Sequence, residues 1–157
     1  MCALSDVTDE SRLRSVHEII CESLPPIIGV LNGAMVLRDV SILNMSYDQF
    51  TTVTRPKVLG SIYLDRIFDH QPLDFFIFFS SINCVVGNLG QANYAAANMF
   101  MCAMAANRRK RGLTGSVSQF LAGFFELPLS DVQYIKRDGR YTAFAIRRLT
   151  GGNVNRL

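Results

Sequence analysis

Hydrophobic and polar residues follow a helical period near the start of the chain. Within residues 8–23, the side chains at positions i, i+3, i+4 and i+7 of one helical face are Leu13, Val16, His17 and Ile20. Thr8 is the expected N-cap, because a threonine hydroxyl can accept a hydrogen bond from a free N–H of the first helical turn. This segment is therefore predicted to form an amphipathic helix.

Three later segments are short and apolar, as buried strands are. They are residues 25–35 (PPIIGVLNGAM), 73–81 (LDFFIFFSS) and 114–123 (TGSVSQFLAG). Two helical segments, residues 46–68 and 90–112, lie between them. The first is expected to break near Pro56, since proline is tolerated in the first turn of a helix but not in its middle. The second is expected to end with Gly112 at the C′ position.

Strands that alternate with helices indicate an α/β fold built from right-handed βαβ units, with a doubly wound parallel sheet. Ligands bind to such sheets beyond the carboxyl ends of the strands. Residues 32–35 and 80–90 would lie there. The pattern is weaker after residue 124, where a hairpin turn at Asp138 and Gly139 is the clearest feature.

Composition limits the classes of function. The 157 residues suit one domain, and 49% hydrophobic with 18% charged residues is a globular profile. A net charge of +3 is too small to indicate a nucleic-acid partner. Four cysteines without CxxC spacing predict no metal site and a reducing compartment. No signal peptide or membrane-length apolar run is visible, so we expect a cytosolic protein without a membrane partner.

Residues 79–100 (FSSINCVVGNLGQANYAAANMF) hold the candidate chemistry and allow three interpretations. The pair Gly87 and Gly90 matches neither phosphate-binding glycine pattern, so a phosphate loop is disfavoured. A helix rich in alanine that merely packs closely on a sheet is the second interpretation. The third is an active site, because Ser81 follows a buried strand while Tyr94 and Asn98 share one helical face.

Lys57, on the preceding predicted helix, completes a set that suits proton donation to a carbonyl group. A nearby ammonium favours the phenolate of Tyr94, so we expect it to lower the pKa of that phenol toward the working range. The Ser81 hydroxyl can donate a hydrogen bond to an oxygen on which negative charge grows. His17 and His70 are expected to be ordinary helix and loop residues.

Five blocks resemble the ketoreductase domain of fungal highly reducing polyketide synthases, which belongs to the short-chain dehydrogenase/reductase superfamily. In chain order they are AMVLRD, RPKVLGS, LDFFIFFSS, GNLGQANYAAANMFM and RRKRGLTGSV. The resemblance extends from about Ala3 to Val117. It implies the C-terminal half of a Rossmann-like fold, and hydride transfer from NADPH to a β-ketoacyl thioester carried on an acyl carrier protein.

The resemblance also implies residue roles. Most of the superfamily has a lysine four residues after the tyrosine, whereas here Asn98 stands there and Lys57 matches the relocated lysine of polyketide synthase ketoreductases. Lys57, Ser81, Tyr94 and Asn98 would form the catalytic tetrad. The implied cofactor-binding residues are Asp6, Val7, Asn32, Gly33, Ala34, Lys57 and Tyr94.

One departure from the family is large: no TGxxGxxG turn exists among the 157 residues. Residues 1–123 are therefore expected to be the catalytic half of the domain, with the cofactor cradle outside this chain and residues 124–157 a divergent tail. The strand at 25–35 would then have an open edge able to pair with another chain. Two functions remain open: a ketoreductase whose isolated chain is inactive, or a non-catalytic remnant that serves as an interaction module.

Overall fold

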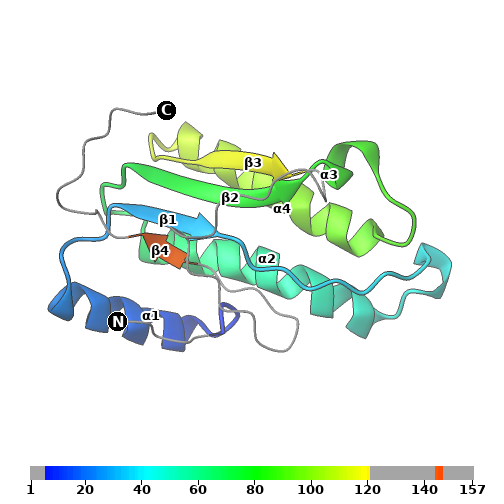
Figure 1. Cartoon of the computed structure of the whole chain (residues 1–157), viewed down its shortest axis with the longest axis horizontal. Coiled ribbons are helices and arrows are strands. Elements are labelled where there is room, and N and C mark those ends of the chain that lie inside the picture. The colour runs from blue at the N-terminus through cyan, green and yellow to red at the C-terminus, as the bar shows by residue number, and fades with distance from the viewer. Residues whose placement is uncertain (1–5, 121–143, 147–157) are drawn as a thin grey trace.

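We describe a computed structural model of the chain, which places residues 6–120 and 144–146. In Figure 1 the strands form one sheet, and the long helices lie beside it. The elements are α1 (Glu10–Ser23), β1 (Gly29–Asn32), the 3₁₀ turn η1 (Ile42–Asn44), α2 (Tyr47–Ile67), β2 (Phe75–Ser81), α3 (Asn83–Val86), α4 (Ala92–Lys110), β3 (Ser116–Phe120) and β4 (Phe144–Ile146). The predicted α/β fold and its strand–helix alternation are confirmed.

The sheet has the order β3-β2-β1-β4. β1 pairs with β2 in parallel, and β2 pairs with β3 in parallel. β4 pairs antiparallel with residues 29–31 of β1. The expectation of an open edge on the strand at 25–35 is therefore wrong for these residues, because β4 occupies that edge. The hairpin predicted at Asp138 and Gly139 lies outside the described residues.

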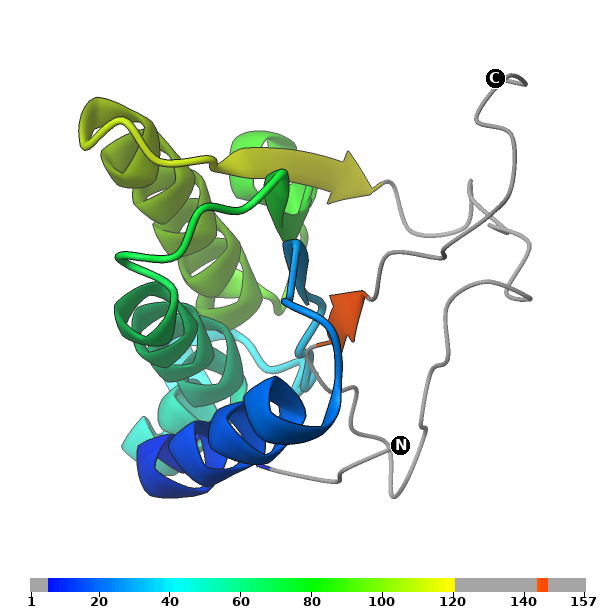
Figure 2. The same cartoon turned by 90° about the vertical axis from the view of Figure 1, so that its left-hand side faces the viewer.

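The three long helices all cover the same face of the sheet. Figure 2 shows α1, α2 and α4 together on one side of the strands. Alternate residues of β2 face them, because successive side chains of a strand point to opposite faces: Phe76, Phe78 and Ser80 are buried. None of the helices placed by the structure is both long and apolar enough to cross a bilayer.

The ends of the helices follow their sequence, with one exception. The N-cap of α1 is Asp9 rather than the expected Thr8, and its carboxylate accepts a hydrogen bond from the backbone N–H of Arg12 at 2.9 Å. Thr8 instead donates to Asp6. At the end of α4, Gly112 has φ +76° at the C′ position, as predicted, and its N–H donates to the Arg109 carbonyl in a Schellman arrangement.

Pro56 lies inside one continuous helix, so the break predicted there is wrong. Proline removes one helical hydrogen bond and costs about 3 kcal/mol in a helix interior. Buried residues on both sides of Pro56 offset that cost. They lie on the face of α2 that packs toward the sheet and α4: Val53 and Thr54 before Pro56, Lys57 and Ser61 after it. Tertiary packing therefore keeps α2 continuous through a residue that would interrupt an isolated helix.

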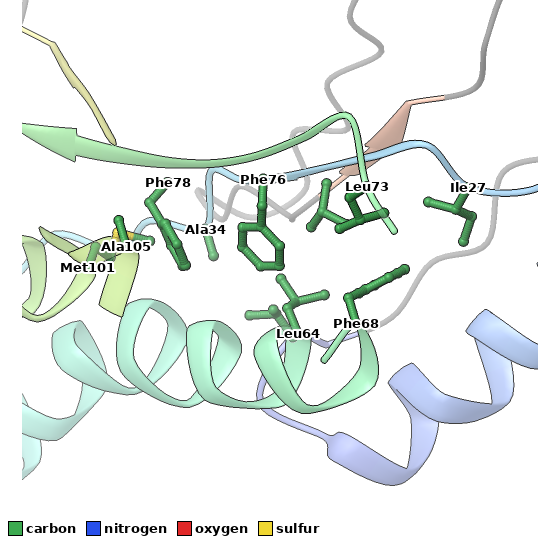
Figure 3. Packing of buried hydrophobic residues seen from close by; sticks show 11 residues of the cluster. Ile27, Ala34, Leu64, Phe68, Leu73, Phe76, Phe78, Met101 and Ala105 are labelled. Atoms are coloured by element: carbon green, nitrogen blue, oxygen red, sulfur yellow. The ribbon is translucent and has the colours of Figure 1, made fainter. Parts of the chain in front are cut away.

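An apolar core fills the space between the sheet and the helices. Figure 3 shows Phe76 of β2 pointing toward Leu64 of α2, while Phe78 lies beside Ala34 on the side of Met101. The two phenylalanine rings lie 4.8 Å apart between centroids. One charged side chain enters this core: Arg108, 1% exposed, stacks its guanidinium 4.1 Å from the Phe76 ring and pairs with Asp65. The core therefore locks α2, α4 and β2 together.

Candidate active site

The carboxyl ends of the parallel strands collect the four predicted catalytic residues. Ser81 is the last residue of β2, Lys57 comes from α2, and Tyr94 and Asn98 are one turn apart on α4. The structure brings all four together, although 41 residues separate the first from the last. Across the placed part of the chain, no cluster of three or more His, Cys, Asp or Glu side chains could hold a metal ion.

Lys57 is buried beneath the tyrosine. Its side chain is 2% exposed, and Nζ donates a hydrogen bond to the Phe79 carbonyl oxygen at 2.8 Å. The same nitrogen lies 3.6 Å from Met101 Sδ and 5.5 Å from the centroid of the Tyr94 ring. Burial disfavours the ammonium and lowers the pKa of Lys57 to about 7. Lys57 is therefore divided between its neutral and charged forms near neutral pH.

Tyr94 is half-buried, and its hydroxyl donates to Met35 Sδ at 3.4 Å. Burial raises the pKa of Tyr94, while hydrogen bonds from the side chains of Asn98 and Ser81 act in the opposite direction. The expectation that Lys57 lowers this pKa is not met, since Nζ faces the ring and burial dominates. The phenol is consequently held in its protonated form.

Asn98 is fully buried and contributes an unused acceptor. Its side-chain Nδ2 donates to the backbone carbonyl oxygen of Tyr94 at 2.8 Å. Its backbone carbonyl oxygen accepts a hydrogen bond from Ser80 Oγ at 3.2 Å. Its side-chain oxygen, Oδ1, has no hydrogen-bond partner among the residues that the structure places. A buried acceptor without a partner lowers the free energy of unfolding by about 1–3 kcal/mol. Such a cost indicates that a donor binds to this oxygen when the site is occupied.

The loop after β1 is tied to the same cluster. Asn32 Nδ2 donates to Ser61 Oγ at 2.9 Å, and Ser61 donates in turn to the Lys57 carbonyl oxygen. Asn32 Oδ1 accepts from the Ala34 N–H at 3.3 Å, which curls the loop back on itself. A Cβ on Gly33 would lie 3.1 Å from the Phe79 ring, so a side chain there would crowd the loop. These contacts hold the loop close to α2 and β2.

Asp6 and Val7 lie apart from the loop, at the entry to α1. The carboxylate of Asp6 accepts hydrogen bonds from both the N–H and the hydroxyl of Thr8 at 2.9 Å. Val7 is 5% exposed and packs on α2, where a Cβ on Gly60 would lie 2.6 Å from Val7 Cγ2. The structure thus gives this pair a local turn and a packing contact, and cofactor binding by it stays a prediction.

A polar network beside the site was missed by sequence reasoning. Gln91 donates to both carboxylate oxygens of Asp39, at 3.1 and 3.0 Å, and accepts from Asn83 at 2.8 Å and Asn88 at 3.1 Å. The Val40 N–H also donates to the Gly90 carbonyl oxygen. These bonds tie the β1–α2 connection to the β2–α4 connection. The polar side chains were visible in the sequence, but their convergence depends on both loops.

Asn93 was missed as well, although it is adjacent to Tyr94. It is 1% exposed, and its Oδ1 accepts from the Tyr94 N–H at 2.8 Å. Its Nδ2 donates to the carbonyl oxygens of Arg38 at 3.1 Å and Gln49 at 3.4 Å. The amide therefore fixes the first turn of α4 against both the β1–α2 connection and the first turn of α2.

Comparison with known proteins agrees with this arrangement. The family model for the KR domain matches residues 1–122, so the chain belongs to the KR domain family, the ketoreductase domains of polyketide synthases. It is 72% identical over 111 residues to the highly reducing polyketide synthase calA of Penicillium decumbens, and 51% identical over 152 residues to the hybrid PKS-NRPS synthetase poxE of Penicillium oxalicum. These alignments cover 71% and 95% of the chain, which spans 4% of the length of each relative.

Solved structures give the same result at the level of the fold. A ketoreductase from the first module of phoslactomycin biosynthesis in Streptomyces sp. HK803 superposes with a TM-score of 0.70 at 32% identity, over 74% of this chain and 27% of that one. A ketoreductase domain from the bacillaene assembly line gives 0.70 at 38% identity, over 74% and 29%. The partial Rossmann-like fold predicted from sequence is confirmed.

Proposed function

We propose that the chain is the catalytic part of a cytosolic polyketide synthase ketoreductase, which uses NADPH to reduce a β-ketoacyl thioester to a β-hydroxyacyl thioester. The observation that carries this proposal is the convergence of Lys57, Ser81, Tyr94 and Asn98 at the carboxyl ends of the strands. In the same proposal, an acyl carrier protein delivers the substrate. Residues 1–123 carry the catalytic part, and residues 124–157 are a divergent tail, of which β4 adds to the edge of the sheet at β1.

Tyr94 is the proton donor in this mechanism. A forming alkoxide is a strong base, and a phenol kept protonated by its raised pKa can donate to it. Ser81 acts on the same oxygen, since its hydroxyl lies close enough to Tyr94 to affect the pKa of the phenol. A hydroxyl placed there polarises the ketone and stabilises the charge that develops on it.

Lys57 returns a proton to Tyr94, and Asn98 holds a water or the lysine in place for this transfer. Lys57, with a pKa of about 7, can give up and regain a proton near neutral pH. Asn98 Oδ1 is a buried acceptor without a partner among the placed residues, which suits a bridging water or the lysine itself as its donor. Lys57 and Asn98 thus form a path for a proton from the interior of the protein to the phenol.

The loop of Asn32, Gly33 and Ala34, together with Lys57 and Tyr94, would hold the nicotinamide end of NADPH, and Asp6 with Val7 would lie near its adenine. The bound cofactor supplies the hydride. The 157 residues contain no TGxxGxxG turn, so we propose that the pyrophosphate is held by residues supplied from outside this segment.

A graft into a relative tests this proposal. Residues 6–120 would replace the matching segment of the calA ketoreductase domain, and the oxidation of NADPH would be followed by absorbance with a β-ketoacyl thioester as substrate. We expect the graft to reduce the thioester. In the graft, Tyr94→Phe should lower kcat roughly 100- to 10,000-fold, because the phenol acts in the chemical step. The Kd for NADPH, measured by calorimetry, should stay within about twofold, since binding does not need that proton.

Tyr63→Phe is the matched control. Tyr63 is a half-buried tyrosine on α2, outside the cluster, and its hydroxyl has no part in the mechanism. The control should keep the rate of the unmodified graft. A graft that binds NADPH and whose Tyr94→Phe variant retains the full rate would disprove the assignment of Tyr94.

A further inference from the structure

Two cysteines that the proposed reduction does not use lie side by side next to the tetrad. Cys84 Sγ and Cys102 Sγ lie 3.8 and 3.6 Å from the same atom, Ser80 Oγ. On their other side, Gln119 Nε2 lies 3.7 Å from Cys84 Sγ and 3.8 Å from Cys102 Sγ. Both cysteines are free and half-buried, and Gln119 is exposed. We call Cys84 and Cys102 the thiol pair; both thiols are partly exposed.

The thiol pair is connected to the catalytic residues through short stretches of chain. Cys84 is on α3, three residues after Ser81, and Cys102 is on α4, one turn after Asn98. Ser80, which contacts both sulfurs, also donates to the carbonyl oxygen of Asn98. A covalent bond between the sulfurs would therefore join the element that follows Ser81 to the helix that carries Tyr94.

We propose that Cys84 and Cys102 form a reversible disulfide by exchange with a low-molecular-weight disulfide such as glutathione disulfide. The Cys102 thiolate attacks one sulfur of the reagent, which forms a mixed disulfide and releases one thiolate. Cys84 loses its proton and attacks Cys102 Sγ, which closes the protein disulfide and releases the second thiolate. The two protein thiols are oxidised by two electrons, and the reagent is reduced to two thiols.

The order of attack follows from the surroundings of Cys84. Burial raises the pKa of the Cys84 thiol, so little thiolate is available there for the first step. The neighbouring sulfur of Cys102 is then the first nucleophile, and Cys84 resolves the mixed disulfide. Cys21 provides a comparison within the chain, because it is exposed and its sulfur contacts His17 rather than a second thiol.

The test uses the full 157-residue chain with Cys2→Ser and Cys21→Ser, so that only the thiol pair remains. The folded protein is treated with glutathione disulfide, alkylated and digested with trypsin. No lysine or arginine lies between Arg66 and Arg108, so both cysteines fall in one peptide, residues 67–108. We expect this peptide to take up no alkyl group, to be lighter by two hydrogen atoms, and to regain two alkylation sites after reduction with dithiothreitol.

Variants test each step. With Cys84→Ser, the glutathione adduct should accumulate on Cys102, because nothing resolves it. With Cys102→Ser, the adduct on Cys84 should form about tenfold more slowly than the adduct on Cys102 forms in Cys84→Ser, as expected for a thiol held protonated. After closure, amide hydrogens of residues 83–86 should exchange more slowly than in the reduced chain, since α3 is then anchored to α4.

A urea-unfolded sample is the control for proximity, and circular dichroism confirms that the treated chain is folded. Closure in the folded chain should exceed that in urea. Stable glutathione adducts on both cysteines, disulfides between chains, or equal closure in urea would each overturn the proposal. None of these measurements depends on reductase activity, so the thiol pair and the proposed function can fail separately.

Discussion

The two ends of the layer between the sheet and the helices are built from opposite kinds of residue. At the amino ends of β1 and β2 the layer is apolar, with Ile27, Leu73 and Phe76 packed against Leu64 and Phe68 (Figure 3). At the carboxyl ends of β1 and β2, these strands together with α2 and α4 bury polar side chains: Asn32, Lys57, Ser61, Ser81 and Asn98.

Along the same two strands, the apolar end therefore stabilises the fold, whereas the polar end holds the groups suited to chemistry. The apolar end buries area that water would otherwise wet, and its one charged residue, Arg108, is paired with Asp65. The polar end buries an amine with a lowered pKa and an amide oxygen without a partner among the placed residues. Such groups reduce stability, and they are typical of functional sites. Substitutions at the two ends should therefore affect different measurements.

The largest expected loss of stability is at the apolar end. Phe76→Ala removes a ring with no solvent exposure that contacts Phe78 and the guanidinium of Arg108. We expect the free energy of unfolding to fall by about 3–5 kcal/mol, measured by urea denaturation. Phe50→Ala, at a residue 40% exposed, is the control and should cost much less. Equal losses at both positions would show that the loss does not come from burial in the apolar end.

Lys57 should make stability depend on pH. Its folded-state pKa is about 7, whereas an unfolded lysine titrates near 10.4. Between these values the unfolded chain holds a proton that the folded chain has lost, so the free energy of unfolding rises with pH. From about pH 7 to about pH 8.5, below the range where tyrosine titrates, the rise should be roughly 1–2 kcal/mol.

Urea denaturation across this range measures the slope, and Lys57→Met is the matched variant. Methionine fills similar space next to Met101 without a titratable group, so most of the pH slope should disappear. An unchanged slope in Lys57→Met would show that another group carries it. Below pH 7 the variant should be the more stable protein, because a buried ammonium no longer has to be accommodated.

The smallest expected change in stability is at the centre of the site. The hydroxyl of Tyr94 donates to a thioether sulfur, which is a weak acceptor. Tyr94→Phe in the full chain should therefore shift the free energy of unfolding by less than about 0.5 kcal/mol, measured by the same urea titration. A loss of about 2 kcal/mol or more would place Tyr94 among the structural residues instead.

Local patterns predicted most of the framework. Short-range preferences specify the apolar strand at 73–81, the helix at 90–112 and the glycine at 112, and all three predictions are confirmed. Pro56 was mispredicted because the packing of α2 on α4 outweighs a local preference. β4 was not predicted, since a three-residue strand depends on a partner distant in sequence.

The site was predicted unevenly for related reasons. The positions of Lys57, Ser81, Tyr94 and Asn98 followed from a resemblance carried by five blocks, and the structure brings them together. The electrostatics did not follow: a lysine near a phenol suggested a lowered pKa for Tyr94, whereas burial raises it. Burial depends on every surrounding side chain, so no pair of residues in the sequence determines it.

Asn93 joins three segments beside the site. Its amide holds the Tyr94 N–H on one side and the carbonyl oxygens of Arg38 and Gln49 on the other. Arg38 belongs to the β1–α2 connection and Gln49 to α2, so one side chain links both segments to the first turn of α4. The position of the Tyr94 phenol therefore depends on segments far from it in the sequence and not on its own helix alone.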